Sequence, residues 1–106
     1  MDGRHCKQDP EPRELSEIRQ EIDLIDEQLL GIIVTRCHLA VSTLDVKRRH
    51  GLHPTDARRE GEVSRKAAIL AQERGLDTEL VHGIFQRVIG LTRAALKAAG
   101  EVEPES

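Results

Sequence analysis

The sequence predicts an all-α protein with one long helix and two shorter helices per chain. Near its start, apolar residues recur in alternating steps of three and four, the heptad pattern of a helix that buries one seam. These seam residues are Leu15, Ile18, Ile22, Ile25, Leu29 and Ile32. Turn residues then interrupt the pattern twice, first around Gly51 and Pro54 and again at Gly75. With one Phe and no Trp or Tyr, the core must be aliphatic.

The long helix is predicted to run from about Leu15 to Arg48. At ~1.5 Å per residue, it would be about 50 Å long. A compact domain of this size has a radius of gyration of about 13 Å, so the seam would project beyond it and stay exposed unless another chain covered it. We therefore predict a homodimer whose long helices pair around a two-fold axis.

Capping residues define the other two helices. Thr55 or Asp56 is a suitable N-cap for a second helix that reaches about Glu73, and Asp77 caps a third. Gly75 can end the second helix in a left-handed conformation.

Composition divides the chain into a helical domain and two short ends. Residues 1–12 are polar and contain two prolines, which predicts a disordered leader without the hydrophobic region of a secretory signal. The helical domain is predicted over 13–99, followed by a flexible acidic tail at 100–106. The longest apolar run, Leu29–Val34, is too short to span a bilayer, so we expect no membrane association.

Charge and cysteine content narrow the function classes. The net charge is −3, with 16 basic and 19 acidic residues, and with so few aromatic residues this predicts no nucleic-acid binding. Cys6 and Cys37 form neither a disulfide framework nor a CxxC pair, and the five histidines do not have metal-ligand spacing. We expect a reduced, cytoplasmic protein without a metal or another cofactor.

Two cations interrupt the apolar face of the long helix. Arg36 takes a seam position, and Lys47 returns to nearly the same azimuth eleven residues later, ~16 Å along the axis. Asp56 and Glu60 lie on the inward face of the second helix, with Arg59 beside them. A half-buried cation requires an anion, which is either a carboxylate of this chain or a bound ligand, unless the side chain extends to water. Two cations on one apolar face favour a bound anion.

These motifs resemble the all-helical chorismate mutases of the AroQ type. The resemblance covers about Leu15 to Lys97 and is strongest in IRQEIDLIDEQLL, in the spacing of Arg36 and Lys47, and in DARRE. It implies an intertwined homodimer of three-helix chains with two active sites. It also implies an isomerase of the shikimate pathway of aromatic amino acid biosynthesis, which rearranges the small dianion chorismate to prephenate without a cofactor.

The resemblance also implies roles for particular residues. Arg36, Lys47 and Arg59 match the cationic residues of the active site, and Arg19 matches an arginine that enters from the partner chain. We expect these residues to bind the substrate, with Lys47 and Arg36 acting directly in catalysis.

Three further positions complete the implied site, and one departs from the family pattern. Asp56 and Glu60 match groups near the 4-hydroxyl and enolpyruvyl ends of the substrate, with Glu60 also counted as catalytic. Thr92 stands where a small hydroxyl residue is usual. Four residues later the family has Gln or Glu against the ether oxygen, whereas this chain has Leu96. The ether oxygen would then depend on Lys47 alone.

Other interpretations remain open at this point. The same scaffold serves isochorismate-pyruvate lyases and mutases of aminodeoxychorismate in secondary metabolism, and a degenerate site would suit a non-catalytic dimerisation or regulatory module. Individual residues also have structural explanations: Asp56 as a helix cap only, Glu60 and Arg59 as an ion pair, and Thr92 as helix packing.

Overall fold

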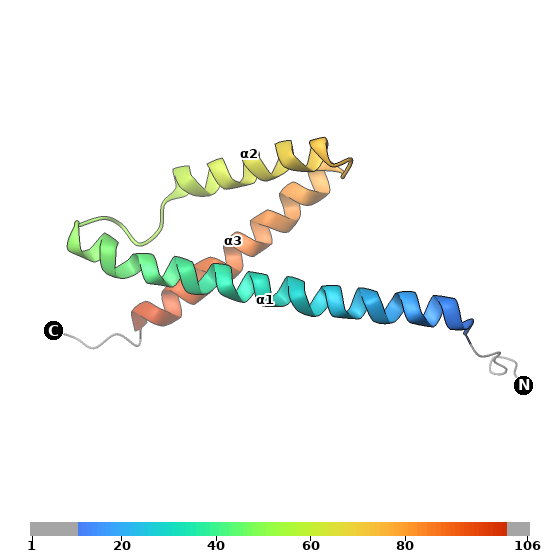
Figure 1. The fold of residues 1–106 in the computed structure, drawn as a ribbon. Helices are drawn as coiled ribbons and strands as arrows, with labels where there is room; N and C mark the ends of the chain where they lie inside the picture. The colour runs from blue at the N-terminus through green and yellow to red at the C-terminus, as the bar shows by residue number, and fades with distance from the viewer. Residues whose placement is uncertain (1–10, 102–106) are drawn as a thin grey trace, which may run out of the picture. The chain divides into compact units, whose positions relative to one another are not determined.

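The computed structural model describes residues 11–101 and contains three helices (Figure 1). They are α1 (Arg13–Arg49), α2 (Ala57–Glu73) and α3 (Thr78–Glu101). No strand occurs within residues 11–101, so the predicted all-α class with one long and two shorter helices is confirmed. Contacts divide the chain into two units, residues 1–32 and 33–106, with the boundary inside α1.

The first unit consists, in its described part, of the N-terminal portion of α1. The helix begins directly after Pro12, whose carbonyl oxygen accepts a hydrogen bond from the Ser16 amide at 3.0 Å. The heptad seam is uncovered in this chain: its six apolar side chains are 39% exposed at Leu15 and up to 66% exposed at Ile32. Burial of apolar surface stabilises a protein by about 25 cal/mol per Å². Because the seam is exposed, it does not contribute this stabilisation within the first unit alone.

The second unit is built on the packing of α2 against α3. Its buried apolar side chains are few and mostly small on the α2 side. They are Ala67, Ala71, Val88, Ile89 and Leu96. Alanines on α2 allow its backbone to approach α3 closely, while the larger side chains of α3 fill the interface.

Capping groups set the ends of the helices. Gly51 and Gly75 adopt φ values of +66° and +74°, the left-handed conformation that ends a helix with little strain only at glycine. Asp56 is the N-cap of α2, and the Asp77 carboxylate accepts a hydrogen bond from the Leu80 amide at 2.9 Å at the start of α3. The boundaries predicted between the helices are therefore confirmed.

Two expectations need adjustment. The third helix continues through Gly100 to Glu101, past the end predicted for the helical domain, while residues 1–10 and 102–106 of the predicted leader and tail lie outside the described residues. In addition, α1 is long enough to cross a membrane and contains an 18-residue stretch of sufficient mean hydropathy, although its uninterrupted apolar runs are short. Core helices of soluble proteins also have these two properties, and an arginine inside the helix would be costly in a bilayer.

Candidate active site

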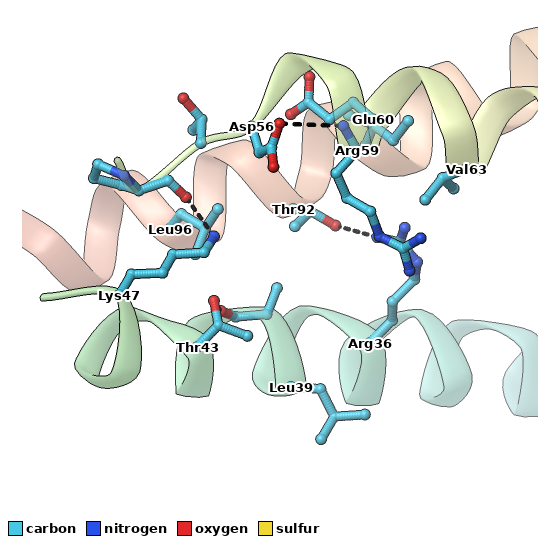
Figure 2. Close-up of a pocket in the computed structure, with 14 residues that line it drawn as sticks. Arg36, Leu39, Thr43, Lys47, Asp56, Arg59, Glu60, Val63, Thr92 and Leu96 are labelled. Carbon is cyan, nitrogen blue, oxygen red and sulfur yellow. Dashed lines mark hydrogen bonds between the residues drawn. The ribbon is translucent and has the colours of Figure 1, made fainter. Parts of the chain in front are cut away.

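A cavity of about 330 Å³ lies within the second unit (Figure 2). All three helices of that unit and the loop between α1 and α2 contribute to its walls, and we call it the first cavity. Its lining residues are Arg36, Leu39, Ala40, Thr43, Lys47, Pro54, Thr55, Asp56, Arg59, Glu60, Val63, Ile89, Thr92 and Leu96. Six of the seven predicted site residues are among them; the exception is Arg19.

The face of α1 that carries Arg36 and Lys47 forms one wall. Both cations line the first cavity, as predicted from helical periodicity, and so do Ala40 and Thr43 between them. Lys47 Nζ donates a hydrogen bond to the carbonyl oxygen of Pro54 at 2.7 Å. An ammonium group has three N–H donors, so this contact fixes the side chain and leaves donors for a ligand.

Thr92 on α3 orients the guanidinium of Arg36. Arg36 Nη1 donates to Thr92 Oγ1 at 2.7 Å, and Thr92 Oγ1 in turn donates to the carbonyl oxygen of Val88 at 3.1 Å. The explanation of Thr92 as helix packing alone is therefore incomplete. Arg59 extends from α2 toward the guanidinium of Arg36 (Figure 2). Two guanidinium groups that line the same cavity provide several N–H donors for a carboxylate.

Asp56 serves as a helix cap and also lines the cavity. Its Oδ1 atom accepts hydrogen bonds from the amides of Arg58 at 3.1 Å and Arg59 at 3.2 Å. The interpretation as a helix cap is thus confirmed. A carboxylate has a second oxygen, however, so capping leaves Asp56 able to accept a hydrogen bond from a ligand.

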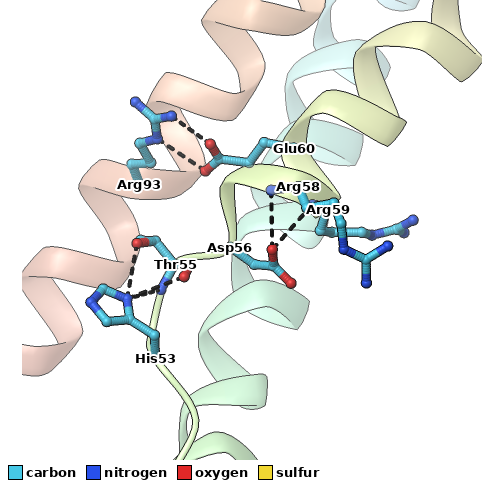
Figure 3. Close-up of polar contacts among 7 residues, drawn as sticks. All are labelled: His53, Thr55, Asp56, Arg58, Arg59, Glu60 and Arg93. Atoms are coloured by element: carbon cyan, nitrogen blue, oxygen red, sulfur yellow. Dashed lines mark hydrogen bonds and ion pairs between the residues drawn. The ribbon is translucent and has the colours of Figure 1, made fainter.

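Glu60 forms an ion pair across the two packed helices (Figure 3). Arg93 Nε donates to Glu60 Oε2 at 3.0 Å, and Arg93 Nη2 donates to Glu60 Oε1. This hydrogen bond, opposed by desolvation, holds the pKa of the Glu60 carboxyl below its ordinary value. The suggested pairing of Glu60 with Arg59 is wrong: Arg59 Nη1 lies 3.7 Å from Glu62 Oε1 instead. Helix geometry explains the difference, because residues three apart face each other and adjacent residues do not.

Leu96 forms part of the cavity wall. It is only 8% exposed and belongs to the core of the second unit. Its side chain has no hydrogen-bond donor, and Lys97, the next residue, does not line the cavity. Within the first cavity, Lys47 is therefore the only ammonium group.

Arg19 belongs to the first unit. Its Nε lies 2.5 Å from Glu11 Oε2, and its side chain is largely exposed. It lines a shallow hollow of that unit together with Leu15, Ile18 and Ile22. The guanidinium is thus next to the uncovered seam.

The first cavity carries an excess of positive charge. Arg36, Lys47 and Arg59 contribute three positive charges, and Asp56 and Glu60 contribute two negative charges. Since Arg93 neutralises Glu60 without lining this cavity, the field inside is more positive than that sum. Such a cavity attracts a small anion with more than one negative charge.

Residues 18–97 match the family model of chorismate mutase type II. The chain belongs to this family. It is 32% identical over 83 residues to a chorismate mutase of Methanocaldococcus jannaschii, covering 78% of this chain and 84% of that protein. It is also 32% identical over 79 residues to a 4-amino-4-deoxychorismate mutase of Streptomyces venezuelae, covering 74% of this chain and 77% of that protein.

Membership of the type II chorismate mutases confirms the predicted family and the predicted enzyme class, an isomerase. It also removes most of the support for a non-catalytic module. Sequence reasoning missed Arg93, which follows the expected hydroxyl residue directly and binds Glu60 from 33 positions away. No local pattern could indicate that pair, because it depends on how α2 and α3 pack.

Proposed function

We propose that the protein rearranges chorismate to prephenate in the first cavity. The observation that carries the proposal is the convergence of Arg36, Lys47 and Arg59 on one cavity of about 330 Å³. This volume lies at the lower end of the range of about 300–1,000 Å³ for small-molecule sites. A compact dianion would fill such a cavity and neutralise its charge.

Binding restricts the substrate to its reactive conformation. Arg36, held by Thr92, and Arg59 from the same cavity lining would bind a substrate carboxylate through several N–H donors. The reaction is unimolecular, so holding the two ends of the molecule within bonding distance lowers the entropic part of the barrier.

Lys47 supplies the main electrostatic stabilisation. In the rearrangement the bond between carbon and the ether oxygen breaks while a carbon–carbon bond forms, and no proton or electron is exchanged with the protein. Negative charge develops on the ether oxygen as its bond breaks. An ammonium group placed there in advance stabilises the transition state more than the ground state. With Leu96 in the wall, Lys47 has no second donor to share this role.

The carboxylates would set substrate orientation. Asp56 would accept a hydrogen bond from the ring hydroxyl through the oxygen that does not cap α2. Glu60, kept ionised by Arg93, would act at the other end of the substrate. Neither role requires proton transfer, which suits a pericyclic step.

The proposal includes a homodimer in the cytoplasm. The uncovered seam of α1 supports the dimer, because six exposed apolar side chains in a row gain stability by pairing with a second copy. Arg19, next to that seam, would then enter the site of the partner chain and bind the second substrate carboxylate. Sedimentation should give the mass of two chains.

A related substrate deserves a direct comparison. The similarity to a 4-amino-4-deoxychorismate mutase favours aminodeoxychorismate as the second candidate. Purified protein should be assayed without cofactor on chorismate, isochorismate and aminodeoxychorismate side by side. We expect prephenate from chorismate with the highest kcat/KM. Faster turnover of another compound would reassign the substrate. If the protein consumed none of the three compounds, the enzymatic proposal would be refuted.

A further inference from the structure

A second cavity of about 470 Å³ lies between α2 and α3 in the second unit. Its lining includes two arginines, a histidine, an amide and a serine, and the only carboxylate in it is Glu60. Because Glu60 is already bound to Arg93, the remaining polar groups carry no unpaired negative charge, and each of them can donate a hydrogen bond. This second cavity is not part of the site proposed above, although Glu60 and Ile89 line both.

Arg65 is the first reason to expect a ligand there. Its guanidinium makes no ion pair with any residue between 11 and 101. It is folded back along α2, since a Cβ built at Gly61 would lie 3.2 Å from Arg65 Nη1. The absence of a side chain at Gly61 therefore gives the guanidinium room at the cavity wall.

Ser64 is the second and independent reason. It is only 4% exposed and lines the second cavity, yet its hydroxyl has no hydrogen-bond partner in the part of the chain that the structure describes. Buried hydroxyl groups are nearly always paired, and an unpaired one indicates a missing partner. A group bound in the cavity would supply it.

We propose that the second cavity binds a small oxyanion, a carboxylate or phosphate group, through Arg65, Ser64 and Arg93. A guanidinium has five N–H donors, and Glu60 uses two of those of Arg93, so three remain for the anion. Gln86 and His82 provide further polar contacts at the wall. The bound anion shares Arg93 with Glu60 and thereby connects the second cavity to the first.

The test is an NMR titration of the full chain with inorganic phosphate, and separately with malonate as the carboxylate probe. Sodium chloride at matched ionic strength corrects for screening. We expect saturable shifts of the Ser64 and Gln86 amide signals and of the Arg93 Nε–H signal. The probe that gives the tighter binding identifies the oxyanion.

Two variants make the titration decisive. Arg65→Gln should weaken binding at least tenfold, whereas Lys66→Gln removes the same charge from the neighbouring exposed position and should leave it unchanged. Shifts that survive Arg65→Gln, or an Arg93 signal that stays in place, would overturn the proposal. Because the titration measures binding, its outcome decides the oxyanion proposal whether or not the protein has mutase activity.

Discussion

Replacing Lys47 by methionine tests the proposed mechanism most directly. The substitution keeps most of the unbranched side chain and removes the ammonium group. Loss of one donor to a developing oxyanion costs typically 10²–10³ in kcat, about 2.7–4 kcal/mol. We expect the upper end of that range, about a thousandfold, because Leu96 offers no second donor at the wall of the first cavity.

The structural cost of the same substitution should be smaller. Lys47 lies in the last turn of α1, where a positive charge contributes roughly 0.3–1 kcal/mol through the helix dipole. Its hydrogen bond to Pro54 contributes about 0.5–1.5 kcal/mol more. The loss of stability is therefore about 2.5 kcal/mol at most, and the variant should remain folded.

The assay is prephenate formation at saturating chorismate, with thermal unfolding measured in parallel. The defect should appear mainly in kcat, since charge develops on the ether oxygen only in the transition state. Lys66→Met is the matched control, because Lys66 is exposed on α2 and lines neither cavity. A Lys47→Met enzyme with kcat within about threefold of the wild type would refute the role given to this residue.

Three further substitutions examine other parts of the second unit. Leu96→Gln should raise kcat several-fold by adding a donor, while an amide in this buried position costs about 1–3 kcal/mol in stability; an unchanged kcat would contradict this. The pKa of Glu60 is lowered from its ordinary value of 4.5, so its pair with Arg93 stabilises the folded state fully when the pH is above 4.5. This stabilisation is lost as the pH falls through the pKa that Glu60 has in the folded state. The wild type should therefore lose its Tm advantage over Glu60→Gln on acidification, and parallel Tm curves would argue against the pair. Gly61→Ala should stabilise α2 by about 0.5–1 kcal/mol, because glycine is unfavourable inside a helix and the new methyl group would displace only the flexible end of Arg65. A lower Tm would show that the Arg65 side chain cannot move aside.

Local chemistry made much of this fold predictable. Capping by Asp56 and Asp77 depends on a few neighbouring residues, so the helix boundaries could be read from the sequence. The common face of Arg36 and Lys47 follows from helical periodicity alone, and both residues line the first cavity.

Tertiary contacts were beyond the reach of that reasoning. The partner of Glu60 is set by the register of α2 against α3, and the sequence offers Arg59 as an equally plausible choice. Ser64 is another example, because a serine among alanines and charged residues on α2 gives no sign of being buried. The second cavity became visible only when both helices were in place.

The uncovered seam of α1 would link the stability of this protein to its own abundance. In the proposed homodimer a second copy would cover it, folding and association would be one process, and the melting temperature would rise with protein concentration. Each tenfold dilution would weaken such a dimer by about 1.4 kcal/mol relative to its separated chains. An enzyme built in this way would also become less active per chain in dilute solution, because the arginine beside the seam would leave its neighbour's active site.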